Sequence, residues 1–171
     1  MTLESTGGFT YEYLQKPGPR TLLVLHGSGG NEVEILRLGE ALDTTASLIA
    51  PRGKVIEDGM NRFFKRTAPG VLDRADLKVR TEELKQFIVE MEGRHSVPTG
   101  SLIGAGYSNG ANILLHLQCL YPEILRASIL FRPTSVALAD TPFVLTGQHI
   151  YIGAGSQDSM TPISRESYRR S

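Results

Sequence analysis

Five short apolar runs, separated by stretches of helical character, constrain the fold of this chain more than any other feature. Their residues are apolar at consecutive positions, so both faces of each strand are expected to be covered. Strands covered on both faces are typical of a parallel sheet between layers of helices. The runs are Thr21–Leu25, Ser47–Ala50, Ser101–Gly106, Ala127–Phe131 and His149–Gly153. Phe9–Leu14 alternates instead and predicts an antiparallel edge strand.

Three helices are predicted between the runs. Asn31 is suited to cap a helix that ends near Leu42. Apolar residues that return every three or four positions predict a second helix over 74–93. A third helix is expected from Asn109 to Leu120. This alternation predicts an α/β fold with a mostly parallel sheet and right-handed crossovers, in a single domain over 1–171. Residues 51–70 are expected to form a long loop beside the substrate.

Composition excludes several classes of partner. The chain has 171 residues, of which 40% are hydrophobic, an ordinary value for a soluble globular protein. Lys+Arg and Asp+Glu number 18 each, so no basic surplus attracts nucleic acid. No apolar run approaches the roughly 18 residues of a membrane span. The first residues do not resemble a signal peptide, and Cys119 has no second cysteine to pair with. We therefore expect a cytoplasmic protein.

The pentapeptide Gly106–Gly110 (GYSNG) is the strongest functional signal, because it is a G-x-S-x-G between an apolar run and a helix. In that context the serine occupies a strained turn that raises its hydroxyl above the sheet, and the glycines leave room for the turn. The amino end of the following helix then points at the reacting centre, where negative charge develops. Ser108 is thus predicted to be a nucleophile. The alternative is an ordinary glycine-rich turn with a capping serine.

A second glycine-rich loop, HGSGG at 26–30, follows the apolar run Thr21–Leu25. In serine hydrolases of this layout, the loop after that strand supplies one oxyanion-hole amide, and the residue after the nucleophile supplies the other. The predicted pair is therefore the backbone amides of Ser28 and Asn109. The alternative, a phosphate-binding loop, lacks both the G-x-x-x-x-G-K-[ST] and the G-x-G-x-x-G pattern.

Asp158 follows the last apolar run, where the orienting carboxylate of a catalytic triad belongs in the chain order Ser, Asp, His. Its role would be to hold an imidazole in the correct tautomer and to stabilise the imidazolium that forms. The alternative is an aspartate in a surface turn.

Taken together, the chain resembles the phospholipase/carboxylesterase family of α/β-hydrolases, which includes the acyl-protein thioesterases. The resemblance implies an α/β-hydrolase fold, hydrolysis of a small carboxylic ester or thioester through an acyl-enzyme on Ser108, and no metal or organic cofactor. It also implies that Asn61, Arg62 and Phe63 line the substrate pocket. The matching segments are LHGSGGNE (Leu25–Glu32), APRG (Ala50–Gly53), NRFF (Asn61–Phe64), GYSNGAN (Gly106–Asn112), YPE (Tyr121–Glu123) and GAGSQDSMTP (Gly153–Pro162).

The family's histidine follows one further helix and strand, and this part of the pattern is missing. The residues after Asp158 include no histidine. A crossover to another parallel strand takes about a dozen residues before that strand begins. We therefore expect a fold truncated at the carboxyl end, with His149–Gly153 as an exposed edge that favours pairing with another chain, a homodimer included. Of the four histidines, only His26 is expected near Ser108.

Three functions remain open from the sequence. The first is a carboxylesterase or thioesterase, and the second is a hydrolase-like remnant that serves as a binding or assembly module. The third, a nucleotide-binding α/β domain, is disfavoured by the incomplete glycine patterns.

Overall fold

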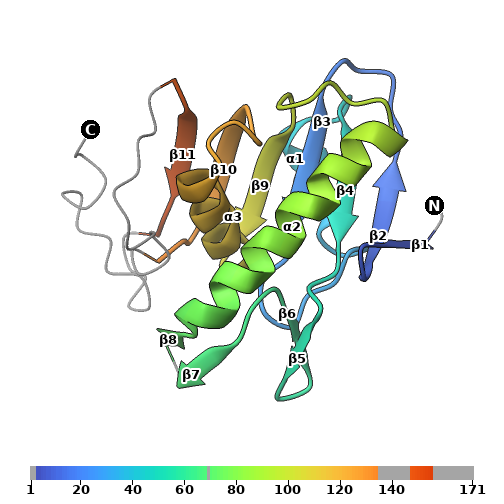
Figure 1. The fold of residues 1–171 in the computed structure, drawn as a ribbon. Coiled ribbons are helices and arrows are strands. Elements are labelled where there is room, and N and C mark those ends of the chain that lie inside the picture. Colours follow the sequence, from blue (N-terminus) through green and yellow to red (C-terminus); the bar gives the residue numbers. More distant parts are fainter. Residues whose placement is uncertain (1–2, 69, 135–146, 156–171) are drawn as a thin grey trace.

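Among the described residues, seven strands form the central sheet, in the order β1-β2-β4-β3-β9-β10-β11 (Figure 1). The structure is a computed structural model, which describes residues 3–68, 70–134 and 147–155. The strands are β1 (Leu3–Thr6), β2 (Phe9–Leu14), β3 (Thr21–Leu25), β4 (Ser47–Pro51), β9 (Ile103–Tyr107), β10 (Ala127–Phe131) and β11 (His149–Gly153).

The sheet is mostly parallel, as predicted. The pairs β4–β3, β3–β9, β9–β10 and β10–β11 are parallel, whereas β1–β2 and β2–β4 are antiparallel. All five apolar runs are strands, with bounds that differ by at most two residues from those predicted. The edge assignment of β2 was wrong, because the short strand β1 lies outside it. The sequence of β1, LEST, carries no apolar run that would have indicated a strand.

Helices cover both faces of this sheet, and a hydrophobic core lies on each side (Figure 1). Strand β3 shows the division, because Leu23 and Leu25 join the larger core while Leu22 and Val24 join the smaller one. A strand buried on both faces needs consecutive apolar residues, which explains the TLLVL run. The larger core contains the buried faces of α2 (Arg74–Arg94) and α3 (Asn109–Leu120), and the smaller one includes Leu36 of α1 (Leu36–Leu42).

Helix α1 begins later than the sequence predicts. The side chain of Asn31 accepts hydrogen bonds from the Val33 and Glu34 amides, at 3.0 and 2.9 Å. Asn31 therefore closes a turn, and the regular helix starts at Leu36 without a side-chain cap. Asparagine readily bonds to nearby backbone amides, as Asn31 does here, but such a bond does not fix where the helix begins.

The segment predicted as a long loop contains two small hairpins instead. They are formed by β5 (Val55–Glu57) with β6 (Met60–Arg62), and by β7 (Arg66–Ala68) with β8 (Val71–Leu72). Asp58 and Gly59 connect β5 to β6 with φ of 52° and 73°. Two successive positive φ angles are the mark of a type I′ turn, for which Asp-Gly is a favoured sequence. That dipeptide was the signal that should have revealed the hairpin.

None of the helices that the structure describes is long and apolar enough to cross a bilayer.

Candidate active site

Ser108 lies at the turn between β9 and α3 with a backbone conformation that L-residues rarely adopt. Its φ is 50° and its ψ is −108°. The Ser108 amide donates to the carbonyl of Phe131 at 2.8 Å, and the Ser108 carbonyl accepts from the Asn112 amide at 2.9 Å. A non-glycine residue held at such angles stores strain, and this kind of strain gathers at functional sites. The turn matches the strained serine turn that its sequence motif predicts.

The two motif glycines are required by the close approach of neighbouring backbone. A Cβ on Gly106 would lie 2.7 Å from the amide nitrogen of Ala111, and one on Gly110 would lie 2.5 Å from the carbonyl oxygen of Leu25. Real Cβ atoms do not approach backbone so closely. The first turn of α3 thus packs directly on the end of β3, where the second glycine-rich loop begins.

That loop, residues 26–30, lies against the serine turn. A Cβ on Gly27 would lie 2.8 Å from Cδ1 of Tyr107, which precedes the serine. Within the loop, the Gly30 amide donates to the carbonyl of Gly27 at 3.1 Å. Over the described part of the chain, the amides of Ser28 and Asn109 have no hydrogen-bond acceptor. Two free main-chain donors therefore lie on adjoining segments beside Ser108.

The predicted pocket residues bond to groups of the protein itself. They are Asn61, Arg62 and Phe63, and the first two bond to the loop at 26–30. Arg62 donates from Nη1 to the Ser28 hydroxyl at 2.6 Å, and Asn61 donates from Nδ2 to the Gly30 carbonyl at 3.0 Å. The Phe63 ring is buried, with 2% of the residue exposed.

His26 is a structural residue of the loop. Its Nε2 accepts from the Gly53 amide at 2.9 Å, so the ring proton is on Nδ1, which lies 2.6 Å from the carbonyl of Gly27. Burial lowers the pKa of this imidazole, against a smaller opposing effect of the bond to Gly27. With both nitrogens in use, His26 has no site left to receive a proton from Ser108.

We expect the neutral form of His26, with the proton on Nδ1, to predominate at pH 6.5, the ordinary pKa of a histidine. Long-range ¹H–¹⁵N spectra report both properties, and a His26→Gln variant identifies the signal. The unfolded chain binds this proton at a higher pH than the folded chain does, so His26 makes the protein less stable as the pH falls below about 6.5. A titration midpoint above 6.5, or a proton on Nε2, would contradict the assignment.

The other three histidines lie elsewhere. His116 is buried and shares a hydrogen bond of 2.8 Å with the Thr81 hydroxyl, and His95 stacks on Tyr13. His149 begins β11, level in register with the first residue of β9. Ser108 follows the last residue of β9, roughly 16 Å away at about 3.3 Å per residue. No histidine of this chain therefore lies next to Ser108.

Asp158 lies outside the described residues. Strand β11, which leads toward it, ends at Gly153, level in register with Phe131 of β10. The carbonyl of that Phe131 bonds to the Ser108 amide, so β11 ends at the same edge of the sheet as the serine turn.

An ion pair near the loop was not predicted. Glu32 is buried, and Arg52 binds its carboxylate through Nε and Nη2. Burial alone would raise the pKa of Glu32, but the hydrogen bond and charge of Arg52 hold it below the ordinary value. The pair joins the segments that follow β3 and β4. Opposite charges just beyond two apolar runs were the available signal, since parallel strands bring their carboxyl ends together.

Over the described residues, no three side chains of His, Cys, Asp or Glu are grouped so that they could hold a metal ion.

Comparisons with known proteins identify the family. No family profile matches the chain. The "Putative hydrolase MhqD" of Bacillus subtilis (strain 168) is 43% identical over 152 residues, covering 86% of this chain and 74% of that protein. Among solved structures, a Bacillus cereus carboxylesterase has a TM-score of 0.82 and 35% identity, covering 89% of this chain and 73% of that one. A carboxylesterase from Mesorhizobium loti gives 0.81 and 31%, covering 88% and 73%.

One family accounts for the sequence of the serine turn, the mostly parallel sheet and these similarities. The chain belongs to the phospholipase/carboxylesterase family of α/β-hydrolases.

Proposed function

We propose that this chain holds the nucleophile and the oxyanion hole of a serine hydrolase that acts on small carboxylic esters or thioesters. Ser108 is the nucleophile, and the backbone amides of Ser28 and Asn109 bind the oxyanion. The observation that carries the proposal is the strained conformation of Ser108 at the turn into α3, with φ at 50°. The carboxylesterase names of the neighbouring structures support the substrate class.

In the acylation step, the Ser108 oxygen forms a bond to the carbonyl carbon while a base takes the hydroxyl proton. The carbonyl electron pair moves to oxygen, and the amides of Ser28 and Asn109 stabilise that charge. Collapse of the intermediate then breaks the bond to the alcohol or thiol, which leaves with a proton. The two amide donors lower the energy of the transition state because they are already in position before the negative charge develops. Water later hydrolyses the acyl-enzyme by the same sequence of steps.

This step needs a base, and none of the four histidines lies beside Ser108. We propose Asp158 as the residue that would orient a histidine base. Loss of the base in a triad costs on the order of 10⁶ in turnover, while the remaining site keeps about 10³–10⁴ over water. Residues 1–171 alone are therefore expected to turn over esters very slowly.

The finding that none of the four histidines lies beside Ser108 favours a second candidate function, a module that binds acyl groups without catalysis. The two candidates differ in the reactivity of Ser108 when a base is supplied.

A fluorophosphonate probe tests the nucleophile. The Ser108 oxygen forms a bond to phosphorus, fluoride leaves, and free imidazole in solution takes the proton. We expect one label per chain, on the peptide that contains Ser108, with imidazole accelerating the reaction. Ser108→Ala should remove the label, and Ser5→Ala, a change at an exposed serine of β1, should not. A folded protein that stays unlabelled at Ser108 in imidazole would overturn the enzyme proposal in favour of the binding module.

A further inference from the structure

The loop that carries Ser28 has little stiffness of its own. Ser28 stands between Gly27 and Gly29, and Gly29 has φ of 81°. Glycine has the widest range of backbone conformations, so a short glycine-rich loop does not by itself fix the direction of an amide. An oxyanion hole works only when its donors lie about 2.7–3.1 Å from the position of the developing charge. The contacts that hold the loop from outside therefore decide where the Ser28 amide points.

Strand β6 supplies three such contacts. The Gly29 amide donates to the carbonyl of Asn61 at 2.9 Å, and the Asn61 side chain donates back to the carbonyl of Gly30 at 3.0 Å. Arg62 donates from Nη1 to the hydroxyl of Ser28 at 2.6 Å. Two of these bonds fix the loop on one side of Ser28, and the Arg62 bond reaches Ser28 itself.

The guanidinium of Arg62 is itself fixed. Its Nε lies 3.2 Å from the carbonyl oxygen of Phe64 and 3.2 Å from Oε2 of Glu57, and the side chain is 6% exposed. Because the side chain is almost fully buried, a substrate group has little room to reach it. Its Nε and Nη1 donors are directed to protein groups, which distinguishes a positioning role from substrate binding.

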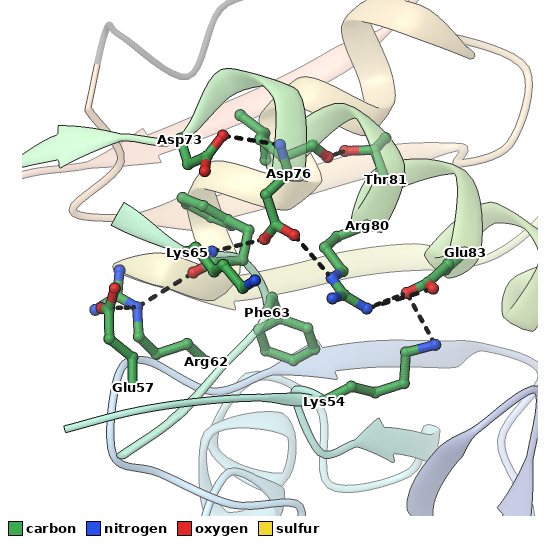
Figure 2. Close-up of polar contacts among 12 residues, drawn as sticks. Lys54, Glu57, Arg62, Phe63, Lys65, Asp73, Asp76, Arg80, Thr81 and Glu83 are labelled. Carbon is green, nitrogen blue, oxygen red and sulfur yellow. Dashed lines mark hydrogen bonds and ion pairs between the residues drawn. The ribbon is translucent and has the colours of Figure 1, made fainter. Parts of the chain in front are cut away.

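Beyond β6, a series of polar contacts connects this segment to helix α2 (Figure 2). The Lys65 amide donates to Oδ2 of Asp76 at 2.8 Å, and Asp76 also pairs with Arg80. Arg80 in turn binds Glu83, which pairs with Lys54 at 2.8 Å. The segments on either side of the β5–β6 hairpin are thus bonded to a helix of 21 residues.

The same segment reaches the second oxyanion donor. The Phe63 amide donates to Oδ1 of Asn109 at 2.6 Å, inside the core. Consecutive residues of the chain therefore bond to the two residues that supply the oxyanion amides, Arg62 to Ser28 and Phe63 to Asn109. The spacing of the two amides therefore depends on residues 62 and 63 as well as on the packing of α3 against the end of β3.

We infer that Arg62 is a positioning residue for the oxyanion hole, which acts by holding the Ser28 hydroxyl and, through it, the direction of the Ser28 amide. The inference rests on the proposed function. Arg62, which the family resemblance placed in the substrate pocket, would thus support the loop at 26–30.

The test is the rate at which Ser108 reacts with a fluorophosphonate in the presence of imidazole, measured over a range of probe concentrations. Arg62→Met keeps an unbranched side chain as far as the position of Nε and removes the guanidinium donors. We expect the maximal rate of labelling to fall about 10- to 100-fold, since misplacing a reacting group by about 1 Å costs up to about 10²-fold. The probe concentration at half-maximal rate should stay unchanged, because the lost interaction acts only in the transition state.

Arg66→Met is the matched control. Arg66 binds the same Glu57, through Nε at 2.8 Å, but has no hydrogen bond or ion pair with the loop at 26–30, all of whose residues the structure describes. The control should label at the rate of the unmodified chain. Ser28→Ala keeps the amide but removes the acceptor of the Arg62 bond, so it should show the same loss as Arg62→Met, and the double variant should lose no more than either alone. Thermal melting of each variant verifies that it is folded.

The outcomes separate the two proposals. If the unmodified chain does not label at Ser108, the proposed function fails, and this inference fails with it. If the unmodified chain labels and both Arg62→Met and Ser28→Ala label equally fast, the proposed function stands and the positioning role is wrong. A loss confined to the half-maximal concentration would also overturn the role, because it would place Arg62 in probe binding. If Arg62→Met does not fold, Ser28→Ala alone decides between these results.

Discussion

Replacing Gly110 by alanine is expected to lower the free energy of unfolding by about 3 kcal/mol or more, at the upper end of what overpacking a tight interior costs. The new Cβ would lie 2.5 Å from the carbonyl oxygen of Leu25 and 2.6 Å from that of His26. Both atoms belong to backbone, so no side-chain rotation relieves the contact. Helix α3 would have to move away from the end of β3, and the loop at 26–30 would lose its position relative to Ser108.

Gly93→Ala is the matched control for that change. Gly93 also lies in a helix, α2, but a Cβ there meets nothing within 4 Å. Alanine is favoured over glycine inside a helix by about 1 kcal/mol, so this variant should be slightly more stable than the unmodified chain. Denaturant unfolding of both variants measures the difference. Equal stabilities of Gly110→Ala and the unmodified chain would contradict the close packing of α3 on β3.

Ser108→Ala and Ser108→Gly are both expected to abolish labelling by the fluorophosphonate, because each removes the oxygen that bonds to phosphorus. Alanine usually gives a more stable protein than glycine does, but at position 108 we expect the glycine variant to be the more stable. Ser108 is held at φ of 50° and ψ of −108°, which alanine tolerates no better than serine does. Relief of such strain is worth about 1–3 kcal/mol, whereas the greater freedom of glycine in the unfolded chain costs about 0.4–1 kcal/mol.

We therefore expect Ser108→Gly to be the more stable of the two by about 1 kcal/mol. Urea unfolding of the two inactive variants measures this difference directly, without interference from catalysis. An alanine variant at least as stable as the glycine variant would show that the turn carries no strain. The pair thus tests the observation on which the proposed function depends.

Much of the fold could be predicted from periodicity. The run at Thr21–Leu25 required a strand buried on both faces, and β3 contributes to both hydrophobic cores. The helix at Asn109–Leu120 has the predicted bounds, because a strained serine precedes it and Pro122 follows it. The start of α1 was mispredicted, because the Asn31 side chain closes a local turn before the regular helix begins.

The support of the site could not be predicted in the same way. The Arg62–Ser28 bond joins residues 34 positions apart, and no periodicity links them. The β5–β6 hairpin, which places Arg62, depends on the Asp58–Gly59 turn, whereas its strands of three residues are too short to show a pattern. Sequence motifs predicted the strained turn at Ser108 and the glycine-rich loop at 26–30, since those positions have rare backbone requirements. Long-range side-chain bonds impose no such requirement on a single position.

Strand β9, which leads into the turn at Ser108, lies between β3 and β10 in the sheet, and these two neighbours come from distant parts of the chain. A ribosome completes β3 long before β9 and completes β10 only afterwards. The carbonyl of Phe131, the last residue of β10, receives the Ser108 amide proton, so the turn acquires its final geometry only after β10 has joined. Covalent labelling of a nascent or refolding chain would therefore mark the moment when the centre of the sheet closes.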